Sequence, residues 1–312
     1  MMMRFGLFLV CGSSVCVARH AAQGPDYVQL NTGAWMPLAN LGGTAQSVRP
    51  GDHYSNYSEF LRVGGCGIDT ALTYTDTINV QIADAIAAHP SIPRPQLWVT
   101  TKVPCCPGSS FCSDPEYNIS TLAAMAKNNA LLRLKTTELT LLHHPCTTTE
   151  ETIQAWLQLE LGLRQGLTKA IGTSNFNAEL LAALAADPRT HVTPAVNQCN
   201  HAIGNHNKSH APTTGGDDET VSYCAAHGIA YSAYSPLEGL HGGNVFELPK
   251  VVAVAARHNV SGAQVALRWL VQQSPPISVV TAAHRPQYIA EDLDLFSWGG
   301  LTPQEMVELA AI

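Results

Sequence analysis

The sequence predicts an α/β fold, a (β/α)8 TIM barrel that follows an N-terminal β-hairpin, and two observations support this prediction. Strand-like apolar runs alternate with helix-like segments along most of the 312 residues. Several of these runs end in one polar, chemically reactive residue, as at Asp69, Lys102 and His143. A parallel barrel collects its reactive side chains where its strands end, so this arrangement is typical of a barrel with an active site. The sequence also lacks the Gly-x-Gly-x-x-Gly segment that a doubly wound nucleotide-binding sheet normally carries.

The predicted elements follow one another in a regular order. Residues 28–38 predict the hairpin, because two short apolar runs flank an Asn-Thr-Gly turn. The first barrel strand is expected at residues 38–41. The other strands are expected near residues 66–69, 97–101, 139–143, 168–173, 194–198, 229–234 and 277–281. Helical patterns fall between the strands at residues 80–88, 150–161, 178–186, 251–258 and 263–272.

Two polar stretches interrupt this alternation. Residues 104–118 are rich in Cys, Pro, Gly and Ser, and residues 204–219 are rich in His, Asn, Gly and Asp. Both stretches follow predicted strands, so both are expected on the rim that carries the site. Long loops there often shape a substrate pocket, but tolerated insertions would have the same composition.

The N-terminal residues are typical of a targeting segment. Arg4 precedes an apolar run over residues 5–18, and no acidic residue occurs before Asp26. An organellar transit peptide would carry more Arg and Ser, and the run is too short to span a bilayer as a mature helix. We therefore predict a signal or targeting peptide over residues 1–24 and one barrel over residues 25–312. The expected location is the secretory pathway or the extracellular space, with an organellar or cytoplasmic location as the alternative.

Cysteines and glycosylation acceptors agree with an oxidising compartment. Seven of nine cysteines remain after residue 24, and a disulfide could close the loop that contains Cys105, Cys106 and Cys112. Four Asn-X-Ser/Thr acceptors predict a glycoprotein, and they are Asn56, Asn118, Asn207 and Asn259. The alternative is that all seven cysteines are reduced thiols and that the acceptors arise by chance, since an odd count fits no simple disulfide framework.

Composition argues against a nucleic-acid partner. Only 13% of the residues are charged, and Asp plus Glu exceed Lys plus Arg by 24 to 17. No cluster of basic residues could neutralise phosphates along a strand. We expect a small-molecule partner and a monomer.

The thirteen histidines raise the alternative of a metal-assisted barrel hydrolase. His143 and His144 are adjacent, and neighbouring residues of a regular strand point to opposite faces, so both could not face one ion. His201, His206 and His210 lie in a polar stretch and are expected to be solvated. We therefore expect no metal site.

The residues at the strand ends fit together as a proton-delivery site for carbonyl reduction. Tyr74 lies five residues after Asp69. A phenol titrates near pH 10 in water, and a nearby ammonium such as that of Lys102 stabilises the phenolate and lowers this pKa. A carboxylate would hold the ammonium, and a histidine would donate a hydrogen bond to the carbonyl oxygen.

These segments resemble the aldo-keto reductases, NAD(P)H-dependent enzymes on a (β/α)8 barrel, over residues 28–308. The Asp-Thr-Ala-x-x-Tyr segment at residues 69–74 is similar to the first signature of the family. The segments that end in Lys102 and that contain His143-His144-Pro145 resemble two further signatures. The resemblance implies that Tyr74 donates the proton, that Asp69 and Lys102 support it, and that His143 orients the carbonyl oxygen.

Cofactor contacts are implied in the same way. Ser174, Asn175 and Gln198 match residues that hold the nicotinamide carboxamide. The segment at residues 233–237 resembles one whose tyrosine, here Tyr234, stacks on the nicotinamide ring. Its serine, here Ser235, reaches the pyrophosphate. The matched segment ends at Leu237.

The adenine-binding segment departs from the family. NADPH-using relatives place Lys-Ser, Arg and Glu-Asn where this sequence has Ala282, Ala283, Tyr288, Glu291 and Asp292. Only Glu291 is kept, and the two cations that would pair with a 2′-phosphate are lost. Arg285 is the replacement that the sequence offers, since a guanidinium suits phosphate. We therefore expect NADPH as the cofactor, with NADH open.

The substrate side departs as well. Ala45 and His144 stand where relatives often carry aromatic residues, and the chain stops at Ile312, before the usual tail over the pocket. A wider and more polar opening is implied, which suits sugar-like or otherwise hydrophilic carbonyls. The remaining alternative is a barrel that binds nucleotide as an auxiliary or regulatory subunit without turnover.

Overall fold

The computed structural model describes residues 26–43, 52–105, 114–206, 215–238 and 243–312. Several positions singled out in the sequence lie outside these described residues: the predicted leader at 1–24, Ala45, Cys106, Cys112, Asn207 and His210.

The predicted barrel is confirmed. Eight parallel strands close on one another in the order β10-β3-β4-β5-β6-β7-β8-β9. The strands are β3 (Ala39–Leu41), β4 (Gly67–Asp69), β5 (Trp98–Val103), β6 (Leu139–Leu142), β7 (Ile171–Ser174), β8 (Val196–Asn200), β9 (Ala230–Tyr234) and β10 (Ser278–Thr281). β7 begins three residues later than predicted, because Thr168 forms only an isolated bridge with Thr137, and β8 begins two residues later than predicted.

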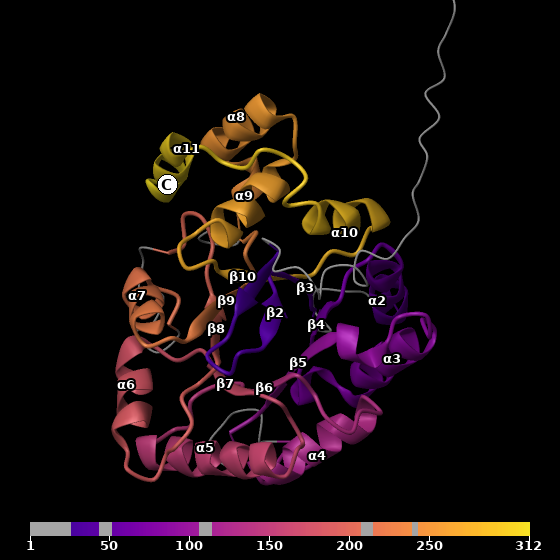
Figure 1. Ribbon diagram of the computed structural model, residues 1–312, viewed down its shortest axis with the longest axis vertical. Coiled ribbons are helices and arrows are strands. Elements are labelled where there is room, and N and C mark those ends of the chain that lie inside the picture. The colour runs from indigo at the N-terminus through magenta and orange to yellow at the C-terminus, as the bar shows by residue number, and fades with distance from the viewer. Residues whose placement is uncertain (1–25, 44–51, 106–113, 207–214, 239–242) are drawn as a thin grey trace, which may run out of the picture.

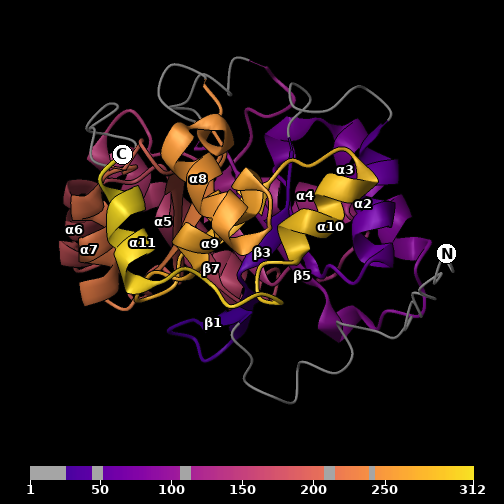
Figure 2. The same cartoon turned by 90° about the horizontal axis from the view of Figure 1, so that it is seen from above.

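The predicted hairpin is also confirmed and covers one end of the barrel. β1 (Tyr27–Gln29) pairs antiparallel with β2 (Trp35–Pro37). Gly33 supplies the positive φ of 83° that the turn between them requires. Val28 and Met36 are buried in the core cluster, and Asn31 Nδ2 donates a 3.0 Å hydrogen bond to the Pro194 carbonyl. Figure 1 shows the hairpin across the ring of strands, and Figure 2 shows it below them.

Helices surround the strands (Figure 1). They are α2 (Asp52–Arg62), α3 (Asp76–Ala87), α4 (Thr121–Leu131), α5 (Thr149–Arg164), α6 (Ala178–Ala186), α7 (Asp218–Ala226), α8 (Pro249–His258), α9 (Gly262–Val271), α10 (Pro286–Leu293) and α11 (Pro303–Ala310). Short 3₁₀ turns occur at η1 (Leu72–Tyr74), η2 (Arg94–Gln96) and η5 (Val245–Glu247). The segment predicted most clearly from its apolar pattern, residues 263–272, forms α9.

Local sequence explains where two of these helices begin. Thr148 and Glu151 form a capping box at the start of α5, with Thr148 Oγ1 accepting from the Glu151 amide at 3.2 Å. Ser261 and Gln264 form the same motif at the start of α9. In each case the two side chains satisfy backbone amides that have no partner inside the helix.

One disulfide corrects the expectation for the cysteine-rich loop. Cys105 pairs with Cys146, with Cα atoms 5.4 Å apart, and not with a neighbour inside its own loop. The two cysteines follow the adjacent strands β5 and β6, so the barrel brings together residues that are distant in sequence. Cys66, Cys199 and Cys224 are buried and take no part in this disulfide.

Exposure separates the three described glycosylation acceptors. The Asn56 side chain is buried in the fold, whereas Asn118 and Asn259 are exposed. Within the described parts of the chain, no helix has both the length and the apolar character needed to cross a membrane.

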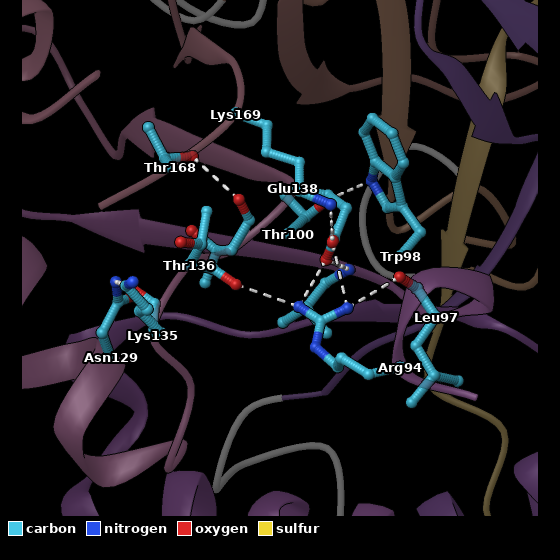
Figure 3. Close-up of polar contacts among 12 residues, drawn as sticks. Arg94, Leu97, Trp98, Thr100, Asn129, Lys135, Thr136, Glu138, Thr168 and Lys169 are labelled. Carbon is cyan, nitrogen blue, oxygen red and sulfur yellow. Dashed lines mark hydrogen bonds and ion pairs between the residues drawn. The ribbon is translucent and has the colours of Figure 1, made fainter. Parts of the chain in front are cut away.

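A buried carboxylate ties three strands together at the end of the barrel where they begin (Figure 3). Glu138 directly precedes β6, and its side chain is 7% exposed. It accepts two hydrogen bonds from Arg94, at 3.0 and 2.7 Å, and one at 3.0 Å from Lys169. It also accepts from the Val99 amide of β5 at 3.0 Å. Reactive residues of a barrel lie at the other end, so this network serves stability.

Glu138→Ala should lower the free energy of unfolding by about 2 kcal/mol, because it leaves the Arg94 guanidinium and the Val99 amide without this acceptor. Urea denaturation checks this value. Lys169→Ala is the matched control: its side chain is 60% exposed, so we expect a loss below about 1 kcal/mol. Equal effects of the two substitutions would contradict the assignment of Glu138 as the centre of the network.

Candidate functional site

The structure brings together the four residues that the sequence singled out. Asp69 ends β4, Tyr74 ends η1, Lys102 lies in β5 and His143 follows β6. The Lys102 ammonium donates hydrogen bonds to Asp69 Oδ1 and, at 3.0 Å, to the Thr70 carbonyl. It also lies 5.2 Å from the centroid of the Tyr74 ring. The Tyr74 and His143 rings meet edge to face, with centroids 5.8 Å apart.

The Lys102–Asp69 ion pair is buried, with Lys102 only 2% exposed. Asp69 is fixed on its other side by Gln198, whose Nε2 donates to Asp69 Oδ2 at 2.9 Å. Sequence similarity implies that Gln198 contacts the nicotinamide carboxamide, and in the structure its amide nitrogen donates to the Asp69 carboxylate. Both oxygens of Asp69 are therefore held by donors.

Burial sets the proton state of Tyr74 and Lys102. Burial raises the pKa of Tyr74, and the nearby Lys102 ammonium only partly offsets this effect. The Lys102 ammonium lowers the pKa of Tyr74 as expected, but the loss of hydration outweighs it, so the net shift is upward. Burial disfavours the charge on Lys102, but Asp69 and Tyr74 outweigh that effect and its pKa is raised. At neutral pH the site thus holds a protonated phenol beside an ammonium.

The two adjacent histidines share one side of the site. Their rings stack, with centroids 4.6 Å apart and planes 16° apart. The expectation that they face opposite ways is wrong, because β6 ends at Leu142 and strand alternation stops before His143. Burial lowers the pKa of His143 well below its usual range and that of His144 to about 4. Thr73 Oγ1 lies 3.3 Å from His143 Nδ1. Both rings are neutral at physiological pH.

Asn175 connects the strand ends on the opposite side. Its Nδ2 donates to the His143 carbonyl at 2.9 Å and lies 3.1 Å from His144 Nδ1. Its Oδ1 accepts from the Tyr234 hydroxyl at 2.8 Å. Asn175 has a φ of 62°, a left-handed conformation that asparagine tolerates better than most residues. Ser174 donates its hydroxyl to the Gln198 carbonyl at 2.8 Å. The three amide and hydroxyl residues predicted for the nicotinamide thus lie beside the four catalytic candidates.

A cavity of about 510 Å³ leads from this cluster to α10. The site end is lined by Asp69, Tyr74, Gln198 and Tyr234. The remaining walls include Ser235, Leu237, Ser261, Gly262, Ala263, Ala282, Ala283, Tyr288, Glu291 and Asp292. Five of the predicted cofactor residues therefore share one cavity, and its two ends suit the two halves of a dinucleotide.

The far end of this cavity is acidic. Its described walls contain Glu238, Glu291 and Asp292 but no Lys or Arg. Positive potential comes from the start of α9, where Gly262 and Ala263 line the cavity. Arg285 precedes α10, with its guanidinium 5.3 Å from the Tyr288 ring centroid and 3.3 Å from the Tyr288 hydroxyl. The polar residues at the site end suit a nicotinamide, and the groups suited to phosphate are this helix terminus and Arg285, which contacts the cavity-lining Tyr288.

Some of these residues were not found from the sequence. The start of α9 carries a recognisable signal, because Ser-x-x-Gln before an apolar run predicts a helix N-terminus. Thr73 carries no such signal, since only the fold brings its hydroxyl to His143. Among the residues that the structure describes, no group of three His, Cys, Asp or Glu side chains is placed to hold a metal ion.

Comparisons with known proteins place the chain in one family. The sequence matches the Aldo/keto reductase family over residues 36–312. It is 31% identical over 283 residues to an aldo-keto reductase of Mycolicibacterium smegmatis, covering 90% of this chain and 89% of the relative. It is 30% identical to morphine 6-dehydrogenase of Pseudomonas putida, covering 90% and 89%. The crystal structure of MGS-M4, an aldo-keto reductase from a deep-sea metagenome library, superposes with a TM-score of 0.77 at 26% identity, covering 91% and 94%.

Asp292→Asn should raise Tm relative to the unsubstituted protein more at about pH 8 than at about pH 4. Burial raises the pKa of Asp292 to about 7, with Thr281 opposing and Glu291 adding to the shift. An acid with a raised folded-state pKa stabilises fully below its unfolded pKa, and that contribution is lost as pH rises through the folded value. Thermal unfolding at both pH values checks this difference. An equal gain at both pH values for Asp292→Asn would refute the account.

Proposed function

Because the chain belongs to the aldo/keto reductase family, we propose that it reduces the carbonyl group of an aldehyde or ketone to an alcohol, with NADPH as cofactor. One observation carries this proposal: Tyr74, Lys102, Asp69 and His143 converge at one end of the 510 Å³ cavity. Bound NADPH would supply the hydride that the carbonyl carbon accepts.

Tyr74 is the proton donor in this proposal. Its raised pKa keeps the phenol protonated, so it can transfer the proton to the carbonyl oxygen as negative charge develops there. The Lys102 ammonium, 5.2 Å from the ring centroid, stabilises the phenolate that remains. Asp69 keeps Lys102 in place and charged.

His143 orients the substrate. Its neutral imidazole carries one N–H, which donates a hydrogen bond to the carbonyl oxygen beside the Tyr74 hydroxyl. His144 stacks on this ring and lines the substrate side. A neutral donor here avoids a second positive charge next to Lys102.

The cofactor contacts extend along the cavity. Ser174, Asn175 and Gln198 would hold the carboxamide, and Tyr234 would contact the nicotinamide ring. Further along, Ser235 would bind the pyrophosphate with Leu237 beside it, Glu291 would bind the adenine, and Arg285 would pair with the 2′-phosphate. The positions of Gln198, Tyr234, Ser235, Leu237 and Glu291 in the cavity wall support these assignments.

The polar His144 on the substrate side favours sugar-like or otherwise hydrophilic carbonyls. A kcat/KM for an aldose above that for an aromatic aldehyde is the expected result, and the reverse order would contradict the substrate class.

We further propose that residues 1–24 direct the chain into an oxidising compartment and that the exposed Asn118 and Asn259 are glycosylated there. The Cys105–Cys146 disulfide supports this location. Sequencing of the mature N-terminus and a mobility shift after enzymatic deglycosylation test both points, and gel filtration tests the expected monomer.

Tyr74→Phe should lower kcat by about 10²–10⁴-fold, because it removes only the acidic hydroxyl from a positioned general acid. Steady-state consumption of NADPH with an aldehyde measures the loss. Binding of NADPH, followed by fluorescence quenching, should be unchanged, which shows that the site is intact. Turnover close to that of the unsubstituted enzyme would refute Tyr74 as the proton donor.

Arg285→Ala should raise the Kd for NADPH by about 10-fold and leave the Kd for NADH unchanged, because only NADPH carries the 2′-phosphate that a guanidinium pairs with. The Kd of Arg285→Lys for NADPH should fall between those of the unsubstituted protein and Arg285→Ala. Fluorescence titration with each nucleotide measures this. Equal changes for both nucleotides, or tighter NADH binding by the unsubstituted protein, would favour NADH as the cofactor.

A further inference from the structure

The Cys105–Cys146 disulfide lies immediately behind two residues of the reactive cluster. Cys105 is three residues after Lys102, and Cys146 is three residues after His143. β5 and β6 are paired up to Val103 and Leu142, and the His143 amide donates to the Val103 carbonyl at 2.9 Å. The disulfide therefore joins the two chain segments just beyond the point where the strand pairing ends.

The segment that it anchors is irregular and carries both histidines. Beyond β6, the His143 carbonyl accepts from Asn175 at 2.9 Å, and the Cys146 amide donates to Thr152 Oγ1 at 3.0 Å. Between these contacts the chain places the stacked His143 and His144 rings against the site. No β-ladder fixes this described segment, so a covalent link at its far end restrains where the rings lie.

We propose that the Cys105–Cys146 disulfide positions His143 and His144, and that its reduction to two thiols slows carbonyl reduction. The claim about rate rests on the proposed function, whereas the claim about position does not. Cys105 and Cys146 act through the histidines and are positioning residues.

The reductant is a dithiol. Its thiolate attacks the sulfur of Cys146, the half-exposed partner, since Cys105 is 1% exposed. The S–S bond breaks, a mixed disulfide forms, and the Cys105 thiolate leaves and takes a proton. The second thiol of the reductant then displaces Cys146. The protein gains two electrons and two protons, and the reductant ends as a cyclic disulfide.

Loosening this segment changes the environment of His143 as well as its position. With the disulfide intact, His143 is neutral because it is buried beside His144 and Lys102. A segment that moves away admits water, which returns the pKa of His143 toward its ordinary value. A role in overall stability alone would not produce this change, so the proton state of His143 distinguishes positioning from stabilisation.

The test compares the oxidised protein, the same protein after dithiothreitol, and the Cys105→Ser/Cys146→Ser double variant. Alkylation and mass mapping establish the pairing. We expect kcat/KM to fall by about 10-fold on reduction, the scale on which misplaced reactive groups act. The acid limb of its pH profile should move to higher pH, and the double variant should behave like the reduced protein and ignore dithiothreitol.

Cys66→Ala is the matched control, because Cys66 is a buried cysteine outside the disulfide, just before β4, at the opposite end of the barrel. It should respond to dithiothreitol as the unsubstituted protein does. Circular dichroism establishes that the reduced protein remains folded. If the double variant does not fold, the comparison is made between the oxidised and the reduced forms of the unsubstituted protein.

A pH titration of the His143 ring by NMR gives a readout that does not need turnover. A higher His143 pKa after reduction supports the proposal even if the oxidised protein reduces no carbonyl, in which case the proposed function alone fails. The same His143 pKa and the same kcat/KM in both redox states would overturn it. Mass mapping that pairs Cys105 with another cysteine would overturn it as well.

Discussion

The site depends on the buried ion pair between Lys102 and Asp69. Removing two charges from water is costly, and a buried pair is tolerated only when hydrogen bonds satisfy its remaining atoms. Here Gln198 donates to the second oxygen of Asp69, and the Thr70 carbonyl accepts from Lys102. These partners come from different strands, so only the closed barrel assembles them. The fold and the charge at its centre therefore support each other.

Burial then determines how the uncharged groups behave. It raises the pKa of Tyr74 and lowers that of His143, so both remain neutral hydrogen-bond donors near the ammonium. The result is one fixed cation with two neutral donors around it. Such a site can stabilise a developing alkoxide with one cation, because neither Tyr74 nor His143 adds a further charge.

Much of this arrangement could be predicted from the sequence, because several predicted strands end in a single reactive residue. Asp69, Lys102 and His143 lie at or next to the ends of β4, β5 and β6, as expected, since strand positions and strand order determine where they lie. The errors lie where the chain leaves a regular element. His143 and His144 stack because β6 stops one residue earlier than alternation requires. The partner of Cys105 could not be found, since the pairing depends on the adjacency of β5 and β6 and not on local spacing. The direction of the Tyr74 pKa depends on burial, which no motif reports.

The network around Glu138 has a consequence for how this protein can change. It binds the starts of β5, β6 and β7 to one another at the end remote from the cavity. The segments that surround the substrate are thus attached to strands that the Glu138 network holds together from the opposite end of the barrel. Loop exchange between members of the family is therefore a practical route to new substrate preferences, provided that the end of the barrel that carries Glu138 is left intact.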